Sequence, residues 1–198
     1  ETVDPAALDQ IELLCNLPFS QGSRIRIMPD VHAGVGCTIG TTMTVTGKVV
    51  PNMVGVDIGC GMETLQIAGK RFELQQLDRL IHAQIPAGMR VRTAPHALAE
   101  EIDLSQLHCA GEIRLDRAYR SIGTLGGGNH FIEADIDEDG NRYLVLHSGS
   151  RHLGVEVANF YQHQAFLALS ENERRELEEA VTAAGKKAGL ASALAYVS

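Results

Sequence analysis

The sequence is short of three features that would each indicate a class of protein: long apolar runs, paired cysteines and an excess of positive charge. Its apolar runs, such as Val54 to Ile58, are broken by glycine or aspartate well short of the roughly 20 residues that cross a membrane. No positively charged stretch followed by an apolar one opens the chain. We therefore expect neither a membrane protein nor a secreted one.

The cysteines and the net charge limit the class of protein further. Cys15, Cys37, Cys60 and Cys109 show no paired spacing, which predicts reduced thiols and a cytoplasmic location. The formal net charge is −8, from 17 basic and 25 acidic residues. Because nucleic-acid binders normally carry a positive surface, this acidic total argues against a phosphate-binding surface, unless further sequence or bound cations supply positive charge.

What is present predicts a folded chain of mixed structure. With 44% hydrophobic and 21% charged residues, the composition is typical of a globular protein. Because strands and helices do not alternate regularly, we predict an α+β fold with a mixed, β-rich core and peripheral helices. Residues 1–155 would form a metal-binding core and residues 156–198 a helical segment. The start at Glu1 indicates trimming or an incomplete chain, so we expect the fold to be incomplete as given.

Local patterns place the individual elements. We predict helices at 4–16, 72–85, 115–122, 155–167 and 171–184, and strands at 25–28, 41–45, 48–50, 130–136 and 142–146. The stretch 90–110 is predicted to be irregular apart from a short helix.

Four glycine-rich segments carry the residues that could perform chemistry. In the first, residues 28–36, Asp30 and His32 fall on the same face of a continuing strand, because side chains alternate along a strand. Such a pair can bind a metal or orient a base. The same segment also suits a structural turn capped by Asp30.

In the second segment, residues 54–62, three glycines surround Asp57 and Cys60. Since these residues are three apart, a compact turn can aim both side chains at one point. A thiolate can bridge two divalent cations, so both residues are candidate metal ligands. The alternative is that Cys60 is a small buried hydrophobic residue, as free cysteines usually are.

The third segment, residues 126–133, places polar side chains after a run of glycines that leaves backbone N–H groups free to meet phosphate oxygens. Because side chains alternate along a strand, His130 should face one side of the strand and Asn129, Phe131 and Glu133 the other. This predicts His130 as a metal ligand and Asn129 and Glu133 as nucleotide contacts. The alternative, which this segment taken alone favours, is that His130 is a hydrogen-bonded core histidine.

In the fourth segment, residues 144–151, an apolar strand delivers His147 to the start of a loop of small residues. Ser148, Ser150 and Arg151 would suit phosphate contacts, Arg151 through its bidentate fork. The alternative is an ordinary strand end with Arg151 on a solvated face.

Taken together, these segments resemble the RtcB family of RNA ligases. The matching stretches are residues 28–32, 54–61, 123–126, 128–133 and 147–151. The resemblance implies an enzyme with two manganese ions that uses GTP to join an RNA 3′-phosphate or 2′,3′-cyclic phosphate to a 5′-hydroxyl end. It further implies that Cys60 bridges the metals, that Asp57 and His130 complete one metal site, and that His147 belongs to the other.

Other roles follow from the same resemblance. Asn129, Phe131 and Glu133 would border the guanine nucleotide, and Asp30 would support the metals or the acid–base chemistry. An activating accessory protein similar to archease is an expected partner. Judged by its ligands alone, a site with a thiolate would favour zinc or mixed occupancy, whereas the family implies manganese.

Three departures from the family pattern stand out: Val35 replaces a common Lys, Gly127 a common Thr or Ser, and His152 a common Gly. The family's histidine nucleophile lies in a His-Gly-Ala-Gly-Arg motif that these 198 residues do not contain. We therefore expect this chain alone not to become guanylylated. Two alternative functions are a metal-dependent phosphoesterase and a non-catalytic module that binds a metal or a partner.

Overall fold

A computed structural model describes residues 3–34, 36–47, 49–50, 53–68 and 73–175. The chain divides into two compact units, one of residues 1–55 together with 161–198 and the other of residues 56–160. The helix α4, Arg151–Ala168, runs through the predicted domain boundary at residue 155, and that boundary stays a prediction.

The first unit is built on helix α1, Pro5–Asn16. The Asp4 side chain caps this helix by accepting a hydrogen bond from the N–H of Ala6 at 3.1 Å, and Pro5 suits its first turn. A short 3-10 turn, η1 (Pro18–Ser20), follows the helix. The small apolar core of the unit contains Leu14, Leu17, Phe19 and Val50, with Ile25, Met43 and Met53 packed against it.

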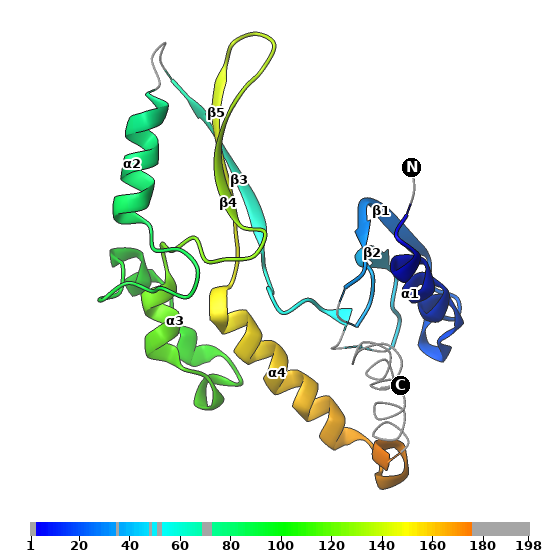
Figure 1. Cartoon of the computed structure of the whole chain (residues 1–198). Coiled ribbons are helices and arrows are strands. Elements are labelled where there is room, and N and C mark those ends of the chain that lie inside the picture. The colour runs from blue at the N-terminus through cyan, green and yellow to red at the C-terminus, as the bar shows by residue number, and fades with distance from the viewer. Residues whose placement is uncertain (1–2, 35, 48, 51–52, 69–72, 176–198) are drawn as a thin grey trace. The chain divides into compact units, whose positions relative to one another are not determined.

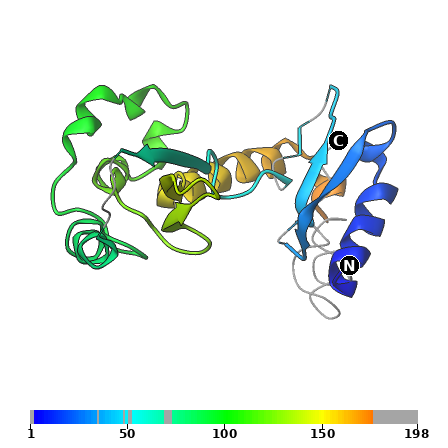
Figure 2. The ribbon, with the colours of Figure 1, turned by 90° about the horizontal axis from the view of Figure 1, so that it is seen from above.

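Strands β1 (Ile25–His32) and β2 (Ile39–Met43) pair antiparallel and lie alongside α1 (Figure 2). The predicted strand at 25–28 is confirmed and extends further than expected. The predicted strand at 41–45 is confirmed over residues 41–43, which pair with β1. The predicted strand at 48–50 is wrong, because residues 49–50 are not in a strand; residue 48 lies outside the described residues. The register shifts between Ile27 and His32, so the pairing is irregular in the stretch that contains Asp30.

The second unit contains a three-stranded antiparallel sheet in the order β3-β5-β4 (Figure 1). Its strands are β3 (Gly61–Ile67), β4 (Phe131–Ile136) and β5 (Arg142–Ser148). The predicted hairpin of β4 and β5 is confirmed, whereas β3 was not predicted. Since β5 is central, it carries the buried Val145, while β3 is exposed along all of its length except Ile67.

Helices and turns complete this unit. Helices α2 (Leu74–Gln84) and α3 (Leu115–Ser121) match predicted helices, and the stretch between them forms the short 3-10 turns η3 (Ala97–Glu101), η4 (Leu104–Gln106) and η5 (Ala110–Glu112). The helix predicted at 155–167 begins earlier, at Arg151. Of the helix predicted at 171–184, residues 171–175 are helical and the rest lies outside the described residues. The α+β class is confirmed.

No helix in the described residues combines the length and the apolar composition that crossing a membrane requires.

Candidate metal and nucleotide site

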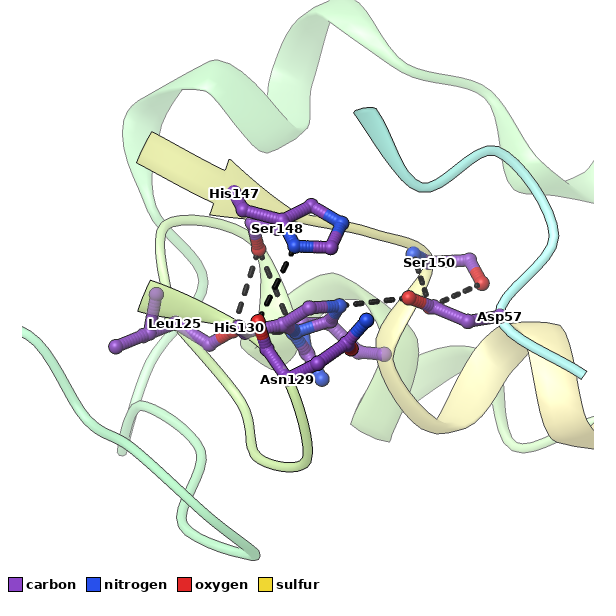
Figure 3. A network of polar contacts seen from close by, with 8 residues as sticks. Asp57, Leu125, Asn129, His130, His147, Ser148 and Ser150 are labelled. Atoms are coloured by element: carbon purple, nitrogen blue, oxygen red, sulfur yellow. Dashed lines mark hydrogen bonds and ion pairs between the residues drawn. The ribbon is translucent and has the colours of Figure 1, made fainter. Parts of the chain in front are cut away.

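Two of the predicted metal ligands meet at one end of the second unit's sheet. His147 lies near the end of β5, and its strand partner Phe131 opens β4 directly after His130. The His130 and His147 rings meet edge-on, with centroids 5.0 Å apart (Figure 3). The centroid of the Phe131 ring lies 5.6 Å from that of His147. Pairing of β4 with β5 therefore brings together two histidines that are 17 positions apart in the sequence.

Asp57 approaches His130 from a distant part of the chain. Its Oδ2 lies 2.6 Å from His130 Nε2, and its Oδ1 accepts hydrogen bonds from the N–H (3.1 Å) and the hydroxyl (3.3 Å) of Ser150. The His130 side chain is 2% exposed and that of Asp57 33%. Such contacts hold a carboxylate in one orientation beside a buried imidazole.

A tight turn joins Asp57 to Cys60. The N–H of Cys60 donates to the carbonyl of Asp57 at 3.1 Å, and Gly59 between them has a φ of +77°, as the third residue of a type II turn requires. Cys60 has an exposed thiol and directly precedes β3, whose residue Met62 pairs with His147. The predicted turn thus exists, and it leaves Cys60 at the end of the sheet that carries His147.

Both histidines are held through the same ring nitrogen. His130 Nδ1 lies 3.0 Å from the carbonyl of Leu125, and His147 Nδ1 lies 3.2 Å from the carbonyl of Asn129 (Figure 3). Histidines that bind metals usually anchor one ring nitrogen on a carbonyl or carboxylate, which orients the other nitrogen toward the metal. In both residues Nε2 is therefore the nitrogen directed away from this carbonyl, and in His130 it faces the carboxylate of Asp57.

Arg151 supports His130. Its guanidinium contacts both His130 Nδ1 and the carbonyl of Leu125. Burial lowers the pKa of this guanidinium, and the charge of Asp57 partly offsets the effect. Its φ of +58° is unusual for a residue other than glycine and costs of order 1 kcal/mol, which indicates that the surrounding contacts impose it.

Two glycines make this close packing possible. A Cβ added at Gly149 would overlap the carboxylate of Asp57, and one added at Gly126 would overlap the guanidinium of Arg151. Glycine at both positions therefore lets the backbone approach the two charged side chains that surround His130.

The predicted metal ligands meet some requirements of a divalent cation. Imidazole nitrogens, a carboxylate and a thiol are all established ligand types, and the histidines are anchored as metal ligands usually are. Over the described ranges, no three His, Cys, Asp or Glu side chains cluster closely enough to hold a metal ion. The closest pair, Asp57 with His130, shares a hydrogen bond in which the Nε2–H donates to the carboxylate. The metal assignments therefore stay predictions.

The predicted nucleotide contacts are distributed differently. Asn129 lines a cleft, Phe131 contacts the His147 ring, and Glu133 is exposed on β4 opposite Val145. Asp30 belongs to the first unit, where its carboxylate lies over Gly40 of β2. The roles of these residues stay predictions.

The cleft beside His130 has a volume of about 510 Å³. Its lining contains Asp57, His130 and Asn129, together with Gly127 and His152, two of the positions that depart from the family pattern. Val35, the third, lies outside the described residues.

Two further arginines in this lining, Arg90 and Arg117, were not singled out by the sequence, because no motif surrounds them. Ser150 and Arg151, which are predicted to contact phosphate, contact Asp57 and His130 in the structure, and their phosphate contacts stay predictions.

An α+β chain with anchored histidines and a carboxylate at one sheet end defines a candidate metal-binding protein. Comparison with known proteins supplies the family. A family model described as tRNA-splicing ligase RtcB matches residues 10–114 and 100–189. The RNA-splicing ligase RtcB of Escherichia coli K12 is 33% identical over 197 residues, covering 89% of this chain and 47% of the relative. The tRNA-splicing ligase RtcB of Archaeoglobus fulgidus is 28% identical over 205 residues, covering 75% and 42%.

The chain belongs to the RtcB family. It spans about half the length of the curated relatives it matches.

Proposed function

We propose that the chain is part of a GTP- and manganese-dependent RNA ligase, which joins a 3′-phosphate or 2′,3′-cyclic phosphate end of RNA to a 5′-hydroxyl end. Family membership and the names of the relatives, RNA-splicing and tRNA-splicing ligases, support this proposal. The structural observation that carries it is the contact of Asp57 with His130, beside a second histidine that is anchored in the same way.

In this proposal Asp57, Cys60, His130 and His147 hold two manganese ions. Bound manganese would stabilise negative charge on the phosphates that are transferred. The chain's own groups prepare the site: the Leu125 carbonyl orients the His130 ring, and Ser150 orients the carboxylate of Asp57. Both residues are therefore held in place before any ligand arrives, which lowers the cost of binding.

Asn129, Phe131 and Glu133 would contact the guanine nucleotide, and Asp30 would support the metal site or the acid–base chemistry. The nucleophilic histidine would come from sequence beyond these residues. An accessory protein of the archease kind would act on the complete enzyme, in the cytoplasm.

The decisive experiment incubates the full-length protein with labelled GTP and manganese. We expect a covalent GMP adduct, and then consumption of that adduct when RNA with a 3′-phosphate is added. Absence of an adduct would overturn the ligase proposal. Release of phosphate from RNA ends without any need for GTP would instead favour a metal-dependent phosphoesterase.

A matched pair of cysteine variants tests the metal assignment. Cys60→Ala should abolish adduct formation and reduce the manganese bound per protein, since it removes the proposed bridging ligand. Cys15→Ala removes another exposed free thiol, from α1, and should change neither quantity. Equal manganese content in both variants would remove Cys60 from the site. Unchanged activity of Cys60→Ala would favour a non-catalytic module.

A further inference from the structure

The cleft beside His130 differs in charge from the chain as a whole. The whole sequence carries a formal net charge of −8. Among the described residues, the lining of the cleft contains three arginines, Arg90, Arg117 and Arg151, and a single carboxylate, that of Asp57. Because Asp57 already contacts His130 and Ser150, the cleft presents more positive charge than its own acidic group can offset.

Arg90 is held at the edge of this cleft by local structure. Residues 86–88 lie beside residues 125–126, through bonds from the N–H of Gly88 to the carbonyl of Gly126 (2.7 Å) and from the N–H of Leu125 to the carbonyl of Pro86 (2.9 Å). Within the described part of the chain, the guanidinium of Arg90 makes a single weak hydrogen bond, from Nε to the carbonyl of Ala87 at 3.4 Å. Its other donors are therefore left for a ligand.

Arg117 reaches the same cleft from α3. One of its amino groups donates to the carbonyl of Met89 at 3.1 Å, which fixes the side chain beside Arg90 in the lining. Its Nε is buried and has no hydrogen-bond partner among the residues that the structure describes. Its other amino group, Nη1, donates to no acceptor among the described residues, and because Arg117 lines the cleft this donor is left for a ligand.

Neither Arg90 nor Arg117 forms an ion pair with a carboxylate in the described part of the chain. The glycine loop that lies beside residues 86–88 adds further donors. Gly127 and Gly128 line the cleft, and across the described residues their backbone N–H groups donate to no acceptor. Guanidinium groups and free backbone N–H groups together are the donors that bind phosphate.

We propose that this cleft binds a phosphate group of the substrate through Arg90 and Arg117, with the N–H groups of Gly127 and Gly128 as additional donors. The site rests on the proposed function for its position beside the reacting groups. Its chemistry fits a phosphate of an RNA strand or a phosphate of GTP. The acidic total charge does not oppose such binding, because the positive charge is concentrated where the phosphate would lie.

The test uses the full-length protein and the variants Arg90→Gln, Arg117→Gln and Arg117→Lys. Binding of a labelled RNA with a 3′-phosphate is measured as a function of salt concentration, and GTP binding is measured separately. We expect each Gln variant to lower the affinity for one of these two ligands, RNA or GTP, by about 10-fold near physiological salt. If the ligand is single-stranded RNA, the slope of log affinity against log salt should fall by about 0.7 for each phosphate that the variant no longer neutralises.

The variants contain their own controls. Arg79→Gln removes the same charge from the exposed face of α2, outside the cleft, and should change neither affinity nor slope. Arg117→Lys keeps the charge and should retain the salt slope while binding more weakly. Arg90→Gln alters an exposed side chain, so it remains folded even if Arg117→Gln does not.

Weaker RNA binding with unchanged GTP binding would assign the site to the RNA, and the reverse result would assign it to the nucleotide. If both Arg90→Gln and Arg117→Lys bind RNA and GTP as the parent protein does, the phosphate site is wrong. RNA binding that depends on Arg90, in a protein that forms no GMP adduct, would keep this site and overturn the ligase proposal instead.

Discussion

The two walls of the cleft differ in how far their polar groups are already satisfied. On the wall formed by Asp57 and His130, each ring nitrogen of the imidazole and each carboxylate oxygen contacts a partner within the chain. On the wall formed by Arg90 and Arg117, most donors have no partner in the described residues. A satisfied network maintains a geometry, whereas unsatisfied donors are available to a ligand.

If this contrast is correct, changes to the satisfied wall should disturb geometry and greatly reduce activity. Changes to polar contacts away from this wall, such as those of Glu156 and Asp137, should instead have small effects that are confined to stability.

The largest effect is expected from Gly149→Ala. Its Cβ would overlap the carboxylate of Asp57 and displace it from His130. Because a displacement of about 1 Å can cost roughly 100-fold in rate, ligation by the full-length protein should fall by about that factor. Gly111→Ala adds the same methyl group where no atom lies within 4 Å, so it serves as the control. Equal activity of the two variants would show that the carboxylate need not occupy this position.

Asp57→Asn should have the next largest effect. The amide keeps the shape of the side chain, but it replaces one acceptor oxygen with a donor beside His130 Nε2 and removes a charge. Manganese affinity, measured by titration calorimetry on the full-length protein, should fall by at least about 10-fold. Asp78→Asn, on exposed α2, is the matched control. Unchanged affinity in the Asp57 variant would remove that residue from the metal site.

A smaller effect, dependent on pH, is expected at the edge of the cleft. Glu156 accepts hydrogen bonds from the Arg114 Nε at 2.6 Å and from its backbone N–H at 3.1 Å, and it lies 3.5 Å from His152 Nε2. Burial alone would raise the pKa of Glu156, but the bonds and charge of Arg114 outweigh it and hold that pKa below the ordinary 4.5.

Because the folded state lowers this pKa, the carboxylate stabilises the fold at pH values above 4.5, and the contribution disappears as pH falls below that value. Glu156→Gln should therefore destabilise the protein by about 1 kcal/mol at neutral pH. In thermal unfolding, its deficit against the parent protein should shrink as the pH is lowered from 4.5. A deficit that is independent of pH would contradict the ionic contact. Glu100→Gln changes an exposed side chain in η3 and should cause no loss of stability, either at neutral pH or below pH 4.5.

The smallest effect should be local, in the hairpin turn between β4 and β5. Asp137 accepts hydrogen bonds from the N–H groups of Asp139 (3.0 Å) and Asn141 (2.8 Å) and from the Tyr143 hydroxyl (2.9 Å). Asp137→Asn removes acceptor capacity and should accelerate amide hydrogen exchange in the turn by about fivefold, the equivalent of roughly 1 kcal/mol. Asp135→Asn, which changes an exposed side chain of β4, should leave the exchange unchanged. Faster exchange across the whole sheet would mean that the hydrogen bonds of Asp137 stabilise the sheet and not the turn alone.

Local patterns predicted the elements whose partners are close in sequence. The β4–β5 hairpin followed from two apolar runs around an acidic turn, and α1 followed from its spacing after Asp4. The exposed strand β3 was missed, because it pairs with β5 about 80 positions later. The sequence also did not predict that β2 pairs with β1 rather than with residues 48–50. The reason is related, because the partner of β2 is set by tertiary packing and not by the turn at residues 46–47.

The candidate site divides in the same way. The residue types alone indicated Asp57, Cys60, His130 and His147, because carboxylate, thiol and imidazole groups in glycine-rich segments are unusual together. The sequence also determined the fold class, the family resemblance and the glycines that close packing requires.

Tertiary structure alone decided how these groups are used. It brought Asp57 to His130, set Ser150 and Arg151 against that pair, and placed Arg90 and Arg117 together in one cleft. The reason is physical: a hydrogen bond or a charged cleft depends on distances between segments, and pairing of distant strands and loops sets those distances. The acidic total charge described the whole chain correctly, yet it could not reveal where the positive charge is concentrated.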